Sequence, residues 1–238
     1  MATEMGEKIP APETVGVVIV SAGASTRMAG VDKTLVELSG IPLIVRTVDV
    51  FETCDAVSSV VLVVSREDLS DVAEISHQRQ WKKIVHVQVG GARRQDSVWI
   101  GLKALPRCAW VIVHDGARPL VTHKTIKDGL LAAKVTGAAT AAVPVTDTIK
   151  VVVDNGRVVE TLDRRTLASV QTPQIFRYDL LYAAHEKTLA DVTDDASMLE
   201  AQGIVVEIFV VDRSNIKVTT RDDLVIAEAL LAARENVP

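Results

Sequence analysis

The feature that most limits how this chain can fold is a series of short runs rich in valine and isoleucine, which alternate with stretches of helical spacing. The first run, 15–20, contains no polar residue, which is typical of a strand covered on both faces. Similar runs follow at 60–64, 85–89, 111–114 and 139–143, and we predict helices at 42–52, 68–80, 96–105, 122–135 and around 224–234. This alternation predicts βαβ units, that is, an α/β fold with a mostly parallel sheet between helices.

Composition limits the partners and the compartment of the protein. We expect one domain over 14–238, preceded by a flexible N-terminal extension over 1–13, because 238 residues that are 48% hydrophobic can bury one substantial core. Aromatic residues are 3% and the net charge is −5, so we expect no nucleic-acid partner. The chain has only two cysteines, and its N-terminus has no apolar run typical of an export signal. No apolar run approaches the roughly 20 residues of a membrane helix, so we predict a cytoplasmic protein with no membrane contact.

One segment, 148–161, interrupts the alternation and is typical of a β-hairpin. Its centre contains Asn155-Gly156, a pair that readily adopts the positive φ angles of a type I′ turn. An isolated two-stranded ribbon is marginally stable in water, so the hairpin needs a surface to pack against. We predict that it forms a homodimer arm at about 145–164; the alternative is a hairpin lying on its own domain.

The loop after the first strand, 21–33, is rich in small residues and carries Arg27 and Lys33. Small residues let backbone N–H groups approach a phosphate, and the two cations add positive charge at the carboxyl end of a strand. Spacing excludes a dinucleotide fingerprint and a P-loop, because the required second glycine and the glycine immediately before the lysine are absent. The loop is either an anion site or an ordinary surface loop.

Two further clusters follow later strands. Gly90-Gly91 permits close backbone approach, and Asp96 or Ser97 can cap the next helix; taken alone, this favours a capped helix start with two solvated arginines, Arg93 and Arg94. In the second cluster Asp115 can hold Mg²⁺, while Arg118 can hold a phosphate or fix the loop. His114, at the end of the same strand, is more often a structural residue than a ligand. The alternative for Asp115 and Arg118 is an ion pair on the surface, which binds neither metal nor phosphate.

The second half of the chain contains four polar segments that composition does not explain. They are typical of a turn (161–164), a loop fixed by proline (171–174), an acidic first turn of a helix (193–197) and a strand end (215–219).

Taken in order, these segments resemble the 2-C-methyl-D-erythritol 4-phosphate cytidylyltransferase family of the non-mevalonate isoprenoid pathway. The resemblance covers about 17–229 and rests on Ala22-Gly23…Arg27-Met28…Lys33, Gly90-Gly91…Arg94-Gln95-Asp96-Ser97-Val98, His114-Asp115…Ala117-Arg118-Pro119, Pro144…Asp147-Thr148-Ile149-Lys150, Gln171-Thr172-Pro173-Gln174, Thr193-Asp194-Asp195-Ala196-Ser197 and Asn215-Ile216-Lys217-Val218-Thr219. It implies a Rossmann-like nucleotidyltransferase core, a protruding β-arm that makes a homodimer, CTP as a substrate and Mg²⁺ as the divalent cation.

The resemblance also assigns roles to residues of this chain. The expected nucleotide-binding residues are Ser21, Ala22, Gly23, Lys33, Gly91, Ser97, Asp115 and Gly116, with Asp115 facing the metal. The expected catalytic residues are Arg27, Lys33, Arg164 and Lys217. The acceptor is expected to contact Asp115, Arg118, Arg164, Thr172, Thr193 and Lys217; Arg164 lies in the arm, which allows it to come from the partner subunit.

The chain departs from the family pattern at a few positions. Asp32 replaces the usual proline before Lys33, the loop between Arg27 and Lys33 is one residue shorter than in some members, and Gly116 replaces the usual alanine, which is expected only to loosen the turn. Two alternatives therefore remain open. One is a cytidylyltransferase for another polyol phosphate such as ribitol 5-phosphate, and the other is a non-catalytic nucleotide-binding relative.

Overall fold

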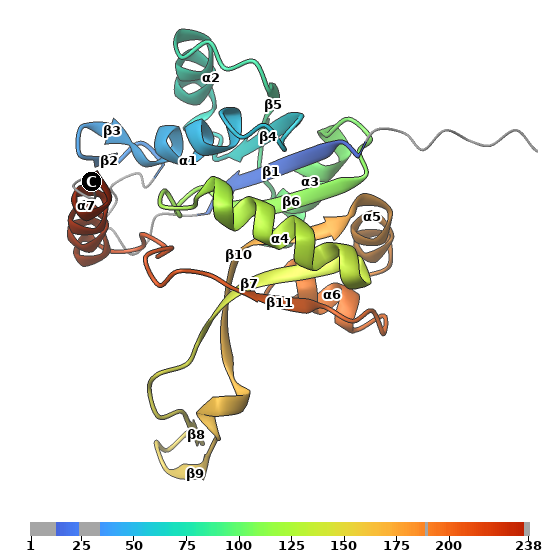
Figure 1. Cartoon of the computed structure of the whole chain (residues 1–238), viewed down its shortest axis with the longest axis vertical. Helices are drawn as coiled ribbons and strands as arrows, with labels where there is room; N and C mark the ends of the chain where they lie inside the picture. The colour runs from blue at the N-terminus through green and yellow to red at the C-terminus, as the bar shows by residue number, and fades with distance from the viewer. Residues whose placement is uncertain (1–12, 24–33, 189, 236–238) are drawn as a thin grey trace, which may run out of the picture.

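The computed structural model describes residues 13–23, 34–188 and 190–235, and its centre is a seven-stranded sheet (Figure 1). The strands lie in the order β11-β7-β10-β6-β1-β4-β5, and β10 runs antiparallel to both of its neighbours while the other pairs are parallel. Their bounds are Val15–Ser21 (β1), Ser59–Val64 (β4), Ile84–Val89 (β5), Trp110–Asp115 (β6), Ala138–Pro144 (β7), Ala168–Arg177 (β10) and Glu207–Val210 (β11). The predicted mostly parallel α/β sheet is confirmed.

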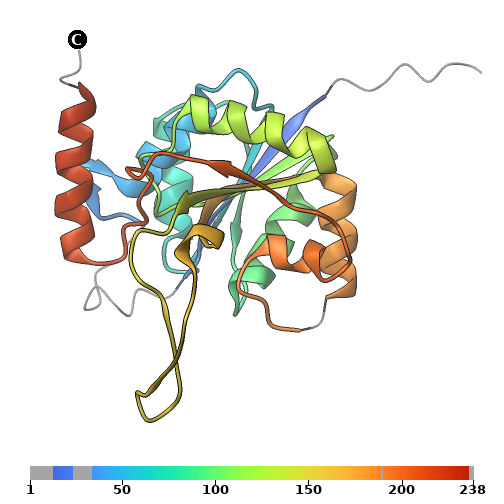
Figure 2. The same cartoon turned by 60° about the horizontal axis from the view of Figure 1, so that its bottom comes forward.

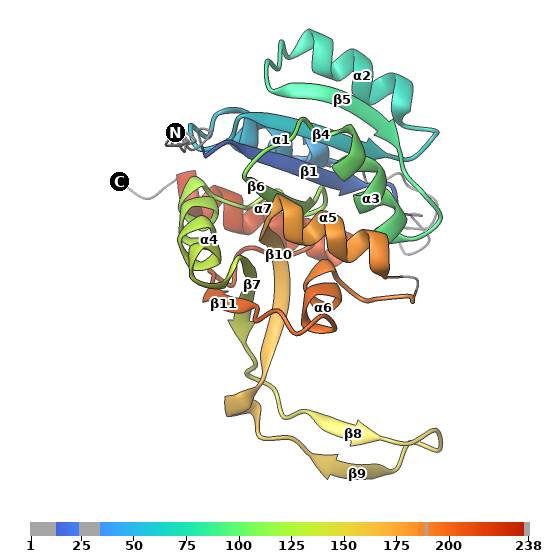
Figure 3. The same ribbon diagram turned by 90° about the vertical axis from the view of Figure 1, so that its right-hand side faces the viewer.

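Helices cover both faces of the sheet (Figures 1 and 3). One face packs against α1 (Leu43–Glu52), α2 (Leu69–Gln78) and α4 (His123–Thr136), and the other against α3 (Arg94–Ala104), α5 (Tyr178–Lys187) and α6 (Asp195–Glu200). The C-terminal helix α7 (Arg221–Glu235) stands apart beside the short pair β2 (Glu37–Leu38) and β3 (Ile41–Pro42), around a small third core (Figure 2).

Alternation along the first strand explains why its sequence is apolar throughout. Val17 and Ile19 point into the core on one face of the sheet, and Val18 points into the core on the other. All three side chains are fully buried, as expected for a central strand of a parallel sheet. This confirms the prediction made from the unbroken apolar run.

The second half of the chain differs most from the sequence prediction. Residues 171–174 lie within β10 rather than in a loop; Pro173 is tolerated because the ladder to β7 is interrupted between Val170 and Gln174. Residues 215–219 follow β11 as irregular chain and do not end a strand. The prediction of an acidic helix start is confirmed, since Asp194 caps α6.

A hairpin of β8 (Lys150–Val152) and β9 (Val158–Thr161) projects away from the sheet, as predicted (Figures 1 and 3). The predicted type I′ turn is wrong. Only Gly156 has a positive φ, of 77°, and its N–H donates to the carbonyl of Val153 while the N–H of Val153 donates to Arg157. This pattern belongs to a longer loop in which glycine alone takes the left-handed position, so Asn155 need not.

The strand order places a switch point between β1 and β6. From β1 the chain continues to β4 and β5 on one side, and then returns to β6 on the other. Ligands of open α/β sheets bind outside the carboxyl ends of the strands at such a point. In this chain those ends are Ser21 and Asp115.

Candidate active site

A pocket of about 320 Å³ opens at this switch point. Its lining consists of Val20, Ser21, Ala22, Gly23, Thr34, Gly91, Ala92, Arg93, Arg94, Ser97, Asp115, Ala117, Lys217, Val218 and Thr219. The segments after β1, β5 and β6 and the segment after β11 therefore meet at one place. Among them are six predicted nucleotide-binding residues, namely Ser21, Ala22, Gly23, Gly91, Ser97 and Asp115.

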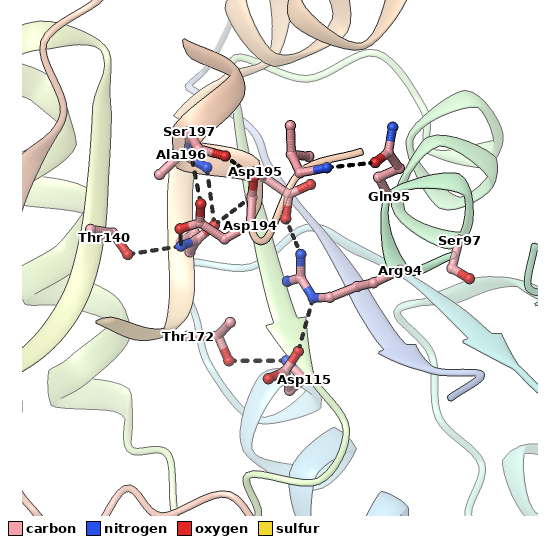
Figure 4. Close-up of polar contacts among 12 residues, drawn as sticks. Arg94, Gln95, Ser97, Asp115, Thr140, Thr172, Asp194, Asp195, Ala196 and Ser197 are labelled. Carbon is pink, nitrogen blue, oxygen red and sulfur yellow. Dashed lines mark hydrogen bonds and ion pairs between the residues drawn. The ribbon is translucent and has the colours of Figure 1, made fainter. Parts of the chain in front are cut away.

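Asp115 is the most enclosed charged group of the pocket lining, with its side chain 10% exposed. Lys217 Nζ lies 2.8 Å from Oδ2, and Arg118 Nε lies 3.7 Å from the same oxygen. Arg94 Nε lies 3.4 Å from Oδ1 (Figure 4). The backbone N–H of Asp115 donates to Thr172 Oγ1 at 3.0 Å, which fixes the backbone at the end of β6.

The three cations keep this carboxylate ionised. Burial acts to raise the pKa of Asp115, but Arg94 and Lys217 lower it well below its usual value. Burial likewise acts against the charge of Arg94, yet Asp195 and Asp115 raise its pKa. An ionised carboxylate of this kind can bind a divalent cation, and the cations beside it can bind phosphate.

Close packing of two loops explains the glycines of the second cluster. A Cβ on Gly90 would collide with the Cβ of Ala22, and the backbone N–H of Gly91 donates to Ser97 Oγ at 3.1 Å. The loop after β5 thus lies directly against the loop after β1. Any side chain at Gly90 would push the two loops apart.

Gly116 lies where the ends of β1 and β6 meet. Its N–H donates to the Val20 carbonyl at 2.8 Å, and a Cβ would lie 3.0 Å from the side chain of Ser21. The alanine that is usual in the family would fit here after a small shift of that side chain, and Gly116 itself is not part of the pocket lining.

His114 precedes Asp115 but lies in the core. Its ring is 5.1 Å from that of Phe51, and Nε2 lies 3.3 Å from the carbonyl of Arg118. Burial lowers the pKa of His114 to about 4, so the ring is neutral at pH 7 and Nε2–H donates to that carbonyl. The prediction of a structural histidine agrees with this geometry.

Acid is expected to destabilise the protein through His114. Because the folded pKa lies below the ordinary value of 6.5, the unfolded chain binds the proton more readily, and stability falls as the pH drops from about 6.5 to about 4. At about 1.4 kcal/mol per pH unit, the loss is about 3 kcal/mol. Urea unfolding of wild type and His114→Gln between pH 7 and 4 measures this difference.

The variant should lack this slope, and His86→Gln, an exposed position on β5, should retain it. The buried carboxylates do not interfere, because the lowered pKa of Asp115 costs stability only below its ordinary value of 3.8. Parallel slopes for wild type and His114→Gln would contradict the assignment.

Four residues expected to contact the acceptor do not line this pocket. Arg118 is buried and donates through Nη1 to the carbonyl of Asn215 at 2.8 Å, so it fixes the loop, one of the two roles expected for it. Thr172 is buried behind Asp115. Thr193 is exposed just before α6, and Arg164 is exposed at the base of the arm, where Nη1 donates to the carbonyl of Thr146 at 2.6 Å.

Arg27 and Lys33 lie outside the described residues, as does Asp32 and most of the predicted N-terminal extension. Their predicted roles stay predictions.

Several residues near the pocket were not assigned a role from the sequence. Arg94 is the most important. It was expected to be solvated, but its side chain is only 27% exposed and bridges Asp115 and Asp195 (Figure 4). Thr34 lines the pocket and its hydroxyl lies 3.1 Å from that of Ser21. The sequence signal that could have directed attention to this arginine is its place in the motif Gly90-Gly91…Arg94-Gln95-Asp96-Ser97-Val98, and the structure begins α3 at Arg94 rather than at 96.

The fold and the pocket define the class of Rossmann-like nucleotide-binding proteins, with glycine-rich loops and cations at the switch point of a mostly parallel sheet. The family model of IspD, 2-C-methyl-D-erythritol 4-phosphate cytidylyltransferase, matches residues 15–233. The chain belongs to this family.

Individual relatives agree with the family match. The chain is 45% identical over 219 residues to 2-C-methyl-D-erythritol 4-phosphate cytidylyltransferase of Dehalococcoides mccartyi, covering 92% of this chain and 96% of the relative. The enzyme of the same name from Alkaliphilus oremlandii is 41% identical with the same coverage. The crystal structure of 4-diphosphocytidyl-2C-methyl-D-erythritol synthase from Anaerococcus prevotii superposes with a TM-score of 0.82 at 29% identity, over 92% of this chain and 96% of that one.

Proposed function

We propose that this protein transfers CMP from CTP to 2-C-methyl-D-erythritol 4-phosphate, giving 4-diphosphocytidyl-2-C-methyl-D-erythritol and pyrophosphate in the non-mevalonate route to isoprenoid precursors. Family membership supplies the substrates. The observation that carries the proposal is the ionised Asp115 with three cations around it, at the switch point of the sheet. Such a site favours a nucleotide and its cation.

The reaction does not require a protein base. A phosphate monoester has a second pKa near 6, so the acceptor phosphate is largely dianionic at neutral pH and can attack the α-phosphorus of CTP directly. In agreement, no histidine is among the described residues that line the pocket, and His114 is buried and neutral.

Catalysis is then a matter of alignment and charge. Lys217, whose side chain is 43% exposed, is free enough to turn from Asp115 to the acceptor phosphate. Arg94 remains beside Asp115 and adds positive charge to the pocket. Arg27 and Lys33 are proposed to meet the charge that develops on the reacting and leaving phosphates.

Asp115 is proposed to hold Mg²⁺. Among the described residues no group of three or more His, Cys, Asp or Glu side chains could hold a metal by itself. Mg²⁺ commonly binds through one or two carboxylates and the phosphates of a substrate, so a single carboxylate beside a nucleotide pocket fits it. The bound ion would neutralise charge on the phosphate oxygens.

The arm is proposed to make a homodimer. Its valines are exposed, among them the cross-strand pair Val152 and Val158, which are 57% and 56% exposed. Since Arg164 lies outside the pocket of its own chain, we propose that it serves the pocket of the partner.

Charged residues on the arm are therefore expected to separate the subunits. The double variant Val152→Asp/Val158→Asp should weaken dimerisation by about 100-fold or more, because two carboxylates would be moved out of water at the interface. Light scattering of the purified protein measures the mass. Leu131→Asp, at an exposed apolar position on α4, is the control and should stay dimeric. A monomeric wild type would contradict the proposal.

The experiment that tests the function measures pyrophosphate release by the purified protein with CTP, Mg²⁺ and 2-C-methyl-D-erythritol 4-phosphate. Ribitol 5-phosphate is assayed in parallel, because both acceptors are short polyol phosphates. Turnover with ribitol 5-phosphate and none with 2-C-methyl-D-erythritol 4-phosphate would show that the proposed acceptor is wrong. An absence of turnover with both would favour the non-catalytic alternative, for which Asp32 beside Lys33 is the observation.

We also propose that the protein works in the cytoplasm without a nucleic-acid partner. Across 13–23, 34–188 and 190–235, no helix has the length and apolar character needed to cross a membrane. The net charge of −5 supports the second part of the proposal.

A further inference from the structure

A buried ion pair connects two segments that lie far apart in the sequence. Asp195, the first residue of α6, is fully buried, and its Oδ2 accepts from Arg94 Nη1 at 2.6 Å. Arg94 is the first residue of α3, and its Nε lies 3.4 Å from Asp115 Oδ1. One guanidinium therefore bridges the carboxylate of the pocket and a carboxylate outside it (Figure 4).

The surroundings of Asp195 make it hard for water to replace Arg94 as the partner of this carboxylate. His185 Nε2 lies 3.5 Å from Asp195 Oδ1, and Trp99 stacks on the His185 ring at 5.4 Å. Burial acts to raise the pKa of Asp195, but Arg94 and His185 lower it. A buried carboxylate without a partner is costly, so Arg94 and Asp195 are expected to move together.

The segment that contains Asp195 is held on both sides of the exposed Thr193. Gln95 donates to the carbonyl of residue 190 and accepts from the N–H of residue 192, both at 3.1 Å. Gln174 accepts from the N–H groups of Asp195 and residue 196 at 3.2 and 3.3 Å. Residues 190–196 are thus attached both to β10, through Gln174, and to the start of α3, which also carries the pocket residues Arg94 and Ser97.

We infer that the Asp195–Arg94 pair couples the acceptor side of the site, around Thr193, to the nucleotide side, around Asp115. Asp195 is then a positioning residue that acts through Arg94, since it is fully buried and does not line the pocket. When one substrate binds on its side of the site, it fixes Arg94 in the position that the other substrate needs. The two substrates therefore strengthen each other's binding to the same extent. This inference rests on the proposed function of the same site.

Binding measurements without turnover test the coupling. The affinity for 2-C-methyl-D-erythritol 4-phosphate is measured calorimetrically with Mg²⁺, with and without a saturating CTP analogue whose α,β-bridging oxygen is replaced by methylene. In wild type the analogue should tighten acceptor binding by about fivefold or more. In Asp195→Asn the enhancement should fall below twofold, while the affinity for the analogue alone changes little.

A second pair of variants separates positioning from folding. Arg94→Lys keeps the charge but not the fork that reaches both carboxylates. Each single variant is expected to lower kcat/KM for the acceptor by about tenfold. The double variant Arg94→Lys/Asp195→Asn should have a kcat/KM no lower than that of the more impaired single variant, because one residue acts through the other. The surface pair Arg177–Asp179 supplies the controls Arg177→Lys and Asp179→Asn, which should behave as wild type.

Each outcome has a defined meaning. Wild-type enhancement in both variants, or losses that multiply in the double variant, would overturn the inference. If Asp195→Asn does not fold, as judged by circular dichroism, Arg94→Lys decides by itself, since its side chain is partly exposed. A wild type that makes no product would refute the proposed function, whereas product formation with no coupling in wild type would refute only this inference.

Discussion

Asp115→Asn is expected to reduce CMP transfer by about 100-fold or more. The carboxylate is the proposed protein ligand of Mg²⁺, and a bound metal contributes several kcal/mol of transition-state stabilisation, where each 1.4 kcal/mol is tenfold in rate. The substitution preserves shape and removes one negative charge, so Arg94, Lys217 and Arg118 would face one another without their common partner. Steady-state pyrophosphate release over a range of Mg²⁺ concentrations measures the loss.

Two observations distinguish loss of the metal from loss of the fold. The variant should need far more Mg²⁺ for its remaining activity, and its unfolding free energy should fall by about 3 kcal/mol, as for a broken buried ion pair. Asp128→Asn, which removes a carboxylate from an exposed pair with Lys124, should leave both quantities nearly unchanged. Wild-type Mg²⁺ dependence in Asp115→Asn would exclude this carboxylate as a ligand.

The fold was predictable where burial dominates the sequence. The runs that became β1, β4, β6 and β7 are largely apolar because both faces of the sheet are covered there, whereas the edge strand β5 alternates with the polar residues His86 and Gln88. Strand β10 was missed because its first residues, 168–170, are exposed next to the arm, and because Pro173 is unusual within a strand. A ladder that is interrupted at the proline cannot be foreseen from local propensity.

The site was predictable to the extent that it follows the ends of strands. Asp115 and Gly91 were found in this way, because the carboxyl ends of parallel strands meet at one edge of the sheet. Arg94 was taken for a solvated residue because its partner Asp195 is brought to it by tertiary structure alone. Ion pairs between distant segments leave no local pattern in one sequence.

Lys33→Ala and Arg27→Ala are each expected to lower kcat by about 10²- to 10³-fold, with much smaller changes in KM for CTP. The reason is that their positive charge is proposed to act on negative charge that develops in the transition state, and removal of one such preorganised group commonly has this effect. Single-turnover rates and KM for both substrates measure the two quantities separately.

Two further substitutions sharpen this last test. Lys124→Ala removes a cation from the exposed surface of α4 and should leave kcat unchanged. Asp32→Asn should keep or raise kcat, because the carboxylate before Lys33 offsets part of the positive charge that the reaction uses. A near-normal kcat in Lys33→Ala or Arg27→Ala would refute the role of that residue, and a lower kcat in Asp32→Asn would show that the carboxylate assists the reaction instead of opposing it.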